Sequence, residues 1–125
     1  EELYKGILEG MAFQMYLAYE RMQELGITMH RIAVTGGGAA SELTLQIRAD
    51  VFGMEVYSLE SAEAGTLGCM LMAATAVKAY PSMQEGIKRA VKSKKKYVPE
   101  TDMTNYYKNK FERYKRFYEV MHDFH

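Results

Sequence analysis

The sequence has few features of a secreted, membrane-bound or nucleic-acid-binding protein. Its single cysteine, Cys69, excludes an intrachain disulfide framework and fits a reducing cytoplasm. No apolar run reaches the roughly 18 residues that span a bilayer, and no charged, apolar and small-residue signal opens the chain. Basic and acidic residues number 16 each, so no net charge attracts a polyanion. We therefore expect a cytoplasmic protein with no nucleic-acid and no membrane partner.

What is present is enough apolar material for a core. The chain has 125 residues, of which 48% are hydrophobic, as expected for one domain or part of one. It opens at Glu1 without a methionine, in a stretch that already has the pattern of a helix interior. This beginning suggests a piece cut from a longer protein.

The most informative stretch is residues 31–41, a β-branched run followed by three consecutive glycines and a helix start at Ser41. Glycines are poor helix and strand formers, because they lose the most backbone freedom on folding. A backbone without Cβ atoms can approach a phosphate closely, and the start of a helix favours negative charge. The pattern favours a nucleotide or phosphate site; the alternative is a tight turn, which needs only one or two glycines.

Two helices are predicted from spacing and caps. Residues 3–25 carry apolar side chains at every third or fourth position, the pattern of one helix face, and Gly26 is expected to end that helix. Ser41 is a plausible N-cap for a second helix that runs to about Phe52, where Gly53 terminates it. The side chains expected to face the core are Leu3, Ile7, Met11, Met15, Ala18, Met22 and Leu25 in the first helix, and Leu43, Ile47 and Val51 in the second.

Short strands are predicted on either side of the second helix, at residues 31–35 and 54–59. Residues 63–80 then have the pattern of a helix rich in glycine and alanine, ended by the proline that follows. A capping-box sequence that begins at Ser82 starts a further helix, which extends to about Val91.

The last third of the chain is expected to hold a basic cluster and a long helix. The four lysines within residues 92–96 fit a solvated helix end better than a nucleic-acid site, and residues 97–99 fit an extended connector. From about Asp102 the chain is helical again. A largely aromatic stripe on that helix is expected to pack on the body of the domain. It consists of four aromatic residues and one methionine: Tyr107, Phe111, Tyr114, Tyr118 and Met121.

These elements predict an α/β fold in the order α-β-loop-α-β-α-α-α, helix-rich with a small incomplete sheet. Two strands make a poor sheet, so we expect further strands before Glu1 in the parent protein. A free-standing piece of this kind should be sticky or dimeric.

Four motifs in register resemble the C-terminal half of the FGGY carbohydrate kinases. They are Leu8-Glu-Gly-Met-Ala-Phe13, Ile32-Ala-Val-Thr-Gly-Gly-Gly-Ala-Ala-Ser41, Gln46-Ile-Arg-Ala-Asp50 with Phe52-Gly-Met-Glu-Val56, and Glu63-Ala-Gly-Thr-Leu-Gly68. The tail, with Pro99 ahead of the aromatic stripe, is similar to the closing helix of xylulose kinases and their relatives.

The resemblance implies a partial actin-like, ribonuclease-H-like ATPase fold. In that family two such domains close over a sugar and ATP, and residues 1–125 would be the last part of the second, nucleotide-binding domain. The backbone of the glycine turn would contact ATP, and Glu42 would stand at the adenine end, where some members have an amide. The residues carried over as ATP contacts are Gly36, Gly37, Gly38, Ala39 and Glu42.

The resemblance also implies what lies outside this chain. Phosphoryl transfer needs a carboxylate at the sugar hydroxyl and a Mg²⁺-bound triphosphate. In this family the general-base aspartate and most sugar contacts precede the present sequence, so no catalytic residue is assigned and the chain alone should not turn over. The expected sugar is xylulose, with glycerol, gluconate and ribulose as alternatives.

Several other residues are expected to be structural. Asp50, the aspartate inside the matching motifs, is expected to cap or pair rather than to catalyse. Glu63, with its nearby glycines, is expected to support the nucleotide pocket from behind. Cys69 is expected to be a small buried hydrophobe. His30, His122 and His125 have no convincing metal-ligand spacing, so no metal site is assigned to this chain.

Two other functions fit parts of the pattern. The glycine turn after a strand is one letter from the Rossmann fingerprint, and Glu60 follows about 20 residues later, at the spacing of the acidic residue that binds the ribose. Ser41 replaces the third glycine of that fingerprint. A non-catalytic binding or assembly module is the other alternative, because actin-like folds also serve structural proteins.

Overall fold

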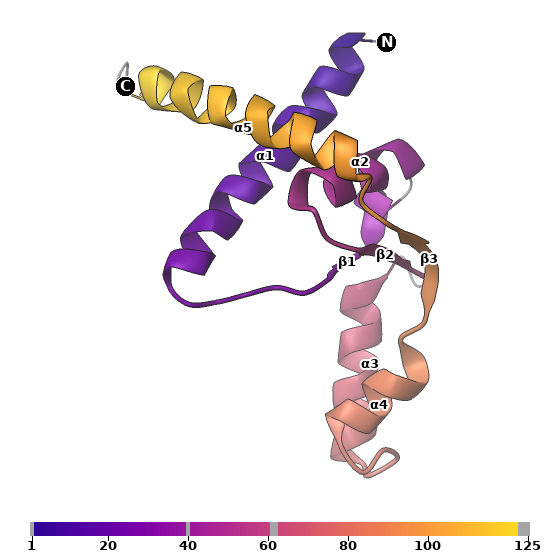
Figure 1. The fold of residues 1–125 in the computed structure, drawn as a ribbon. Helices are drawn as coiled ribbons and strands as arrows, with labels where there is room; N and C mark the ends of the chain where they lie inside the picture. The colour runs from indigo at the N-terminus through magenta and orange to yellow at the C-terminus, as the bar shows by residue number, and fades with distance from the viewer. Residues whose placement is uncertain (1, 40, 61–62, 123–125) are drawn as a thin grey trace.

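The computed structural model describes residues 2–39, 41–60 and 63–122, and Figure 1 shows their arrangement. The predicted helix-rich α/β fold with a small sheet is confirmed, with one strand more than expected. The elements are α1 (Glu2–Glu24), β1 (Ile32–Val34), the 3-10 turn η1 (Gly36–Ala39), α2 (Glu42–Phe52), β2 (Val56–Leu59), α3 (Ala64–Ala76), α4 (Met83–Ala90), β3 (Ser93–Tyr97) and α5 (Thr101–His122).

The sheet has the order β1-β2-β3, with β2 in the middle. β1 and β2 are parallel, with Ile32 opposite Val56, and η1 and α2 form the crossover between them. β3 runs antiparallel to β2, with Tyr97 opposite Val56. The glycine turn therefore lies directly at the carboxyl end of β1.

The prediction for the lysine cluster was wrong, because most of it forms β3 rather than a helix end. Four of the five residues of this strand are exposed, and Tyr97 is its buried member. A strand with so few buried positions shows no apolar alternation in its sequence. Its backbone is fixed by a distant residue instead, since Lys95 N donates to Ser58 Oγ (3.2 Å).

Most of the predicted helix ends are confirmed. Ser41 Oγ accepts a hydrogen bond from Thr44 N, and the Ser82 hydroxyl accepts one from the third residue of α4 in the same way, both at 3.3 Å. Gly26 and Gly53 adopt left-handed φ angles of 79° and 61° after α1 and α2. These signals are local, which is why sequence reasoning found them.

α3 is shorter than expected, because it ends at Ala76 rather than at residue 80. Lys78 takes a left-handed φ of 61°, and Ala79 N donates back to Ala74 O (2.8 Å), which closes the helix. Pro81 follows this turn and does not itself end the helix. A proline restricts only the residue before it, here Tyr80, so it does not explain why the helix ends as early as Ala76.

The core has two connected parts. One lies between α2 and the sheet and consists of Val34, Leu45, Ala49, Val56 and Tyr97. The other lies where α5 crosses α1 beside α2 (Figure 1) and includes Leu8, Phe13, Tyr19, Phe52, Tyr107 and Phe111. We call this second part the aromatic cluster. The predicted packing of the α5 stripe is confirmed at Tyr107, Phe111 and Tyr114, whereas Met121 is exposed.

The face of α1 that we expected to be buried is instead exposed. Leu3 is 79% exposed, and Ile7, Met11, Met15, Ala18, Met22 and Leu25 are exposed as well. Phe13, Tyr16 and Tyr19 take the inner side, because their rings meet the rings of Phe52 and Phe111. α1 is apolar on more than one face, so periodicity alone chose the wrong one. Leu43 in α2 is likewise exposed.

α3 and α4 project together from the other side of the sheet (Figure 1). They pack on each other through Leu71, the buried residue of α3, which lies against Gly86 of α4. Cys69 is exposed, so the expectation of a buried cysteine was wrong. The physical reason is that one face of α3 meets α4, and Cys69 lies off that face. Across the described ranges, no helix is both long and apolar enough to cross a membrane.

Candidate functional site

The glycine turn η1 connects the end of β1 to the start of α2. Gly36 has a φ of 72°, a conformation that side-chain-bearing residues rarely adopt. Gly37 and Gly38 are exposed, and among the described residues no atom lies within 4 Å of a Cβ placed on Gly37. The backbone of this turn is therefore accessible to a ligand. Ala40, which belongs to the same motif, lies outside the described residues.

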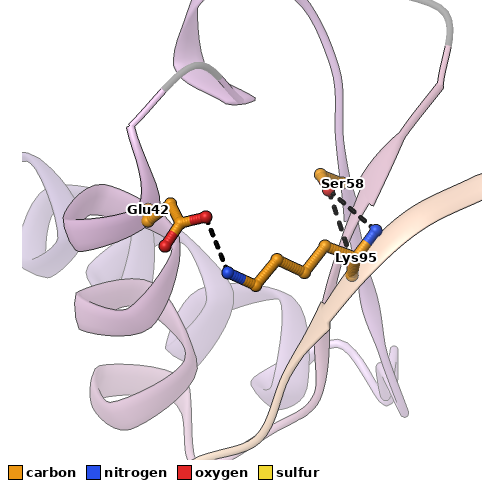
Figure 2. A network of polar contacts seen from close by, with 3 residues as sticks. All are labelled: Glu42, Ser58 and Lys95. Atoms are coloured by element: carbon orange, nitrogen blue, oxygen red, sulfur yellow. Dashed lines mark hydrogen bonds and ion pairs between the residues drawn. The ribbon is translucent and has the colours of Figure 1, made fainter.

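Glu42 begins α2 and is held toward the sheet. Its Oε1 atom accepts from Lys95 Nζ at 2.6 Å, as Figure 2 shows. This hydrogen bond raises the pKa of Lys95 above its ordinary value. Ser58 fixes the backbone of Lys95 from β2, donating to its carbonyl oxygen at 3.3 Å. Residues from α2, β2 and β3 are thus joined beside the glycine turn.

Arg48 lies against the same turn and was missed by the sequence reasoning. It is only 9% exposed, and both terminal nitrogens lie 3.4 Å from the position of a Cβ on Gly38. Burial lowers the pKa of the guanidinium. The available signal was an arginine between two apolar residues of a buried helix face, Ile47 and Ala49, seven positions after the cap at Ser41.

Asp50 has the structural role that we predicted. Its Oδ1 atom accepts from Glu100 N (2.8 Å), at the start of α5, and from Gln46 Nε2 (3.1 Å). The carboxylate therefore ties α2 to α5 and is buried. These bonds leave it unsuited to positioning a substrate hydroxyl.

The supporting role expected of Glu63 stays a prediction. Glu63 stands at the N-cap of α3 without a side-chain capping bond. Gly65 and Gly68 have open space at their Cβ positions in the described part of the chain. The described residues hold no group of three or more potential metal ligands, and His125 lies outside them.

Comparison with known proteins defines the class. The sequence profile of the FGGY family of carbohydrate kinases, C-terminal domain, matches residues 1–77, and the chain belongs to this family. This membership favours the kinase interpretation over the Rossmann alternative.

The similar proteins differ in the substrates that their names give. The xylulose kinase of Bacillus subtilis is 28% identical over 114 residues, which cover 91% of this chain and 23% of that protein. A glycerol kinase of Saccharolobus islandicus is 32% identical over 96 residues, which cover 76% of this chain and 19% of that kinase.

Two solved structures from Lactobacillus acidophilus, a ligand-bound xylulose kinase and a gluconate kinase, each superpose with a TM-score of 0.85. Both are 23% identical, and each match covers 92% of this chain and 23% of the other. These structures confirm the fold. The chain spans about a quarter of the length of the xylulose kinases that it matches.

Proposed function

We propose that residues 1–125 form the C-terminal part of the second, nucleotide-binding domain of an ATP-dependent carbohydrate kinase. The parent enzyme would transfer the γ-phosphoryl group of ATP to a sugar hydroxyl. The observation that carries this proposal is the glycine turn, whose accessible backbone stands between a parallel strand and a helix start. The family assignment of residues 1–77 supports it.

Gly36, Gly37, Gly38 and Ala39 would contact ATP through their backbone. Backbone N–H groups at the start of a helix bind phosphate oxygens, and the helix dipole adds to the attraction. A side chain on Gly37 would meet no atom of the described chain, so the protein's own packing does not explain why that position lacks one. Close approach of a nucleotide to the backbone would explain the glycine at this position.

Glu42 would stand at the adenine end of the site. A carboxylate can only accept hydrogen bonds, whereas the amide found in some relatives can also donate. Lys95 binds one carboxylate oxygen, Oε1, and the other could accept from the 6-amino group of adenine. The ion pair would then fix the direction of that acceptor.

The chemistry itself would use residues outside this chain. Phosphoryl transfer needs a carboxylate at the attacking hydroxyl and a metal ion on the triphosphate. Asp50 is committed to Gln46 and Glu100, so we place the general-base aspartate, and the residues that help to hold Mg²⁺, in the preceding sequence. The isolated chain should therefore be inactive.

Xylulose is the substrate that we favour, because several similar proteins are named xylulose kinases. Glycerol, gluconate and ribulose are the alternatives, since glycerol and gluconate kinases are also similar. We further propose a cytoplasmic location, consistent with the lone cysteine, and a homodimer, consistent with the exposed apolar face of α1. No nucleic-acid or membrane partner is proposed.

The test is ADP release by the full-length protein across these four substrates, with the Gly37→Ala variant beside the wild type. Because the added methyl group meets open space, the variant should fold normally. It should nevertheless raise KM for ATP about tenfold or more, the effect of losing about 1.4 kcal/mol of binding. Gly6→Ala, on α1 and equally open, is the matched control and should leave KM unchanged.

Two results would contradict the proposal. Release of no ADP with any of the four substrates would remove the proposed kinase function. An unchanged KM for ATP in Gly37→Ala would remove the glycine turn from the nucleotide site while leaving the kinase function in place.

A further inference from the structure

Arg48 is a buried cation placed against the glycine turn. It lies on α2, two helical turns beyond the cap at Ser41, and it is more than nine-tenths buried. Both Nη1 and Nη2 lie 3.4 Å from the Cβ position of Gly38. Because Gly38 has no side chain, the end of the guanidinium reaches the turn itself.

Within the part of the chain that the structure describes, this guanidinium makes no hydrogen bond and no ion pair. The two carboxylates nearest to it along α2 are engaged elsewhere, since Glu42 binds Lys95 and Asp50 binds Gln46 and Glu100. Burial alone accounts for the lowered pKa of Arg48, with no contribution from a neighbouring acid. A guanidinium has five N–H donors and stays charged, so an unpaired one in a buried position is costly.

An anion at the turn would remove this cost. The accessible backbone of Gly37 and the N-terminus of α2 already favour a negatively charged group there. The planar fork of an arginine matches phosphate oxygens and can bind two of them at once. Turn, helix start and guanidinium therefore converge on the same kind of ligand.

We propose that Arg48 binds a phosphate group of the nucleotide, as a charged side-chain contact beside the glycine turn. This inference rests on the proposed nucleotide site and adds a side chain to a set of contacts that is otherwise made by backbone. In the free protein the charge is unpaired, and nucleotide binding supplies its partner.

The experiment compares the full-length wild type with Arg48→Met and Arg48→Lys, using titration calorimetry with ADP and adenosine. Arg48→Met removes the charge and keeps a long side chain. It should weaken ADP binding about 10- to 100-fold, the loss expected for a charge-assisted hydrogen bond. Adenosine has no phosphate, so its affinity should not change, and Arg48→Lys should recover part of the ADP affinity.

Thermal unfolding without ligand shows whether the charge is unpaired before nucleotide binds. Removing an unpaired buried charge should leave the melting temperature of Arg48→Met equal to or above that of the wild type. Pyrophosphate should raise the melting temperature of the wild type but not of this variant. The matched control is Arg89→Met, which removes an exposed arginine of α4 and should behave as the wild type throughout.

Three outcomes separate this inference from the proposed function. Equal ADP affinity in wild type and Arg48→Met overturns the inference and leaves the proposed function standing. A lower melting temperature for Arg48→Met with unchanged ADP affinity also overturns it, and shows instead a carboxylate partner elsewhere in the protein. If the wild type binds neither adenosine nor ADP, the proposed function fails; a pyrophosphate shift that needs Arg48 would still establish the anion site.

Discussion

The aromatic cluster and the α3–α4 pair are built in opposite ways. In the aromatic cluster, rings from three helices meet. The ring centroid of Phe13 lies within 6.0 Å of the centroids of three other rings, those of Tyr107, Phe111 and Tyr114. In the α3–α4 pair, Leu71 and Gly86 are the buried residues, while larger apolar side chains such as Met72 are exposed. The comparison shows that cohesion in this domain comes from α1, α2, α5 and the sheet that packs on α2. The α3–α4 pair contributes little to it.

The largest effect is expected from Phe13→Ala. This change opens a cavity at the centre of the aromatic cluster and should lower the free energy of unfolding by about 3–5 kcal/mol. Denaturant unfolding measures it. The matched control is Phe117→Ala on α5, where the residue is 64% exposed and the cost should stay within about 0.5 kcal/mol. Equal costs for the two variants would contradict the comparison.

A smaller loss is expected from Tyr107→Phe, which breaks a polar contact inside the aromatic cluster. The Tyr107 hydroxyl donates to buried Glu9 Oε1 (3.1 Å), and Lys110 Nζ donates to Oε2 of the same carboxylate (2.5 Å). Removing the hydroxyl leaves one donor fewer at a buried acid. We expect a loss of about 1–3 kcal/mol at neutral pH, again by denaturant unfolding.

The same variant tests a pH dependence. Burial, followed by the nearby charge of Glu9, raises the pKa of Tyr107 above its ordinary value of 10.0. The folded state therefore holds this proton more tightly than the unfolded state. The resulting stabilisation is complete below pH 10 and is lost as the pH rises toward the higher folded pKa. Tyr107→Phe should flatten the loss of stability above pH 10; an unchanged slope would contradict this assignment.

Gly86→Ala should affect the α3–α4 pair alone. An added Cβ would lie 2.9 Å from Leu71 Cδ2 and 3.0 Å from Tyr80 Cδ2, too close for either contact. We expect a local cost of about 1–2 kcal/mol from this overpacking. Hydrogen exchange measured residue by residue should speed up in α3 and α4 and stay unchanged in α1 and α5. Faster exchange in all four helices would show that the two regions are coupled.

The smallest effect is expected from Cys69→Ser. Because the thiol is exposed, the substitution should change stability by less than about 0.5 kcal/mol. A thiol reagent should label Cys69 in the folded wild type at close to the rate of the unfolded chain. Protection from labelling would show that another part of the protein covers this face of α3.

The features predicted correctly from the sequence depend on near neighbours. The Ser41 hydroxyl accepts a hydrogen bond from the backbone of Thr44, only three residues later. The left-handed glycines Gly26 and Gly53 likewise act within one helical turn. β1, β2 and the glycine turn also have local signals, in β-branched runs and consecutive glycines. Such features can be predicted without knowing the tertiary contacts of the chain.

The features missed depend on residues far apart in the chain. β3 is defined by pairing with β2 and by a hydrogen bond from Lys95 to Ser58, 37 residues away. The face of α1 that is buried depends on contacts with rings of α5 such as Phe111, which lies about a hundred residues later in the chain. In the candidate site, the glycines were predicted, but the partner of Glu42 lies 53 residues away, and the burial of Arg48 requires the folded turn. Periodicity carries none of this information.

The hydrogen bond from Glu60 N to Lys92 O, 2.9 Å long, has an evolutionary consequence. It closes a loop of chain, from residue 60 to residue 92, whose two ends leave and rejoin neighbouring strands of the sheet. A segment with adjacent ends can be lengthened, shortened or exchanged without moving its anchors. The turn that joins α3 to α4 can therefore change in length without moving the strands or the glycine turn.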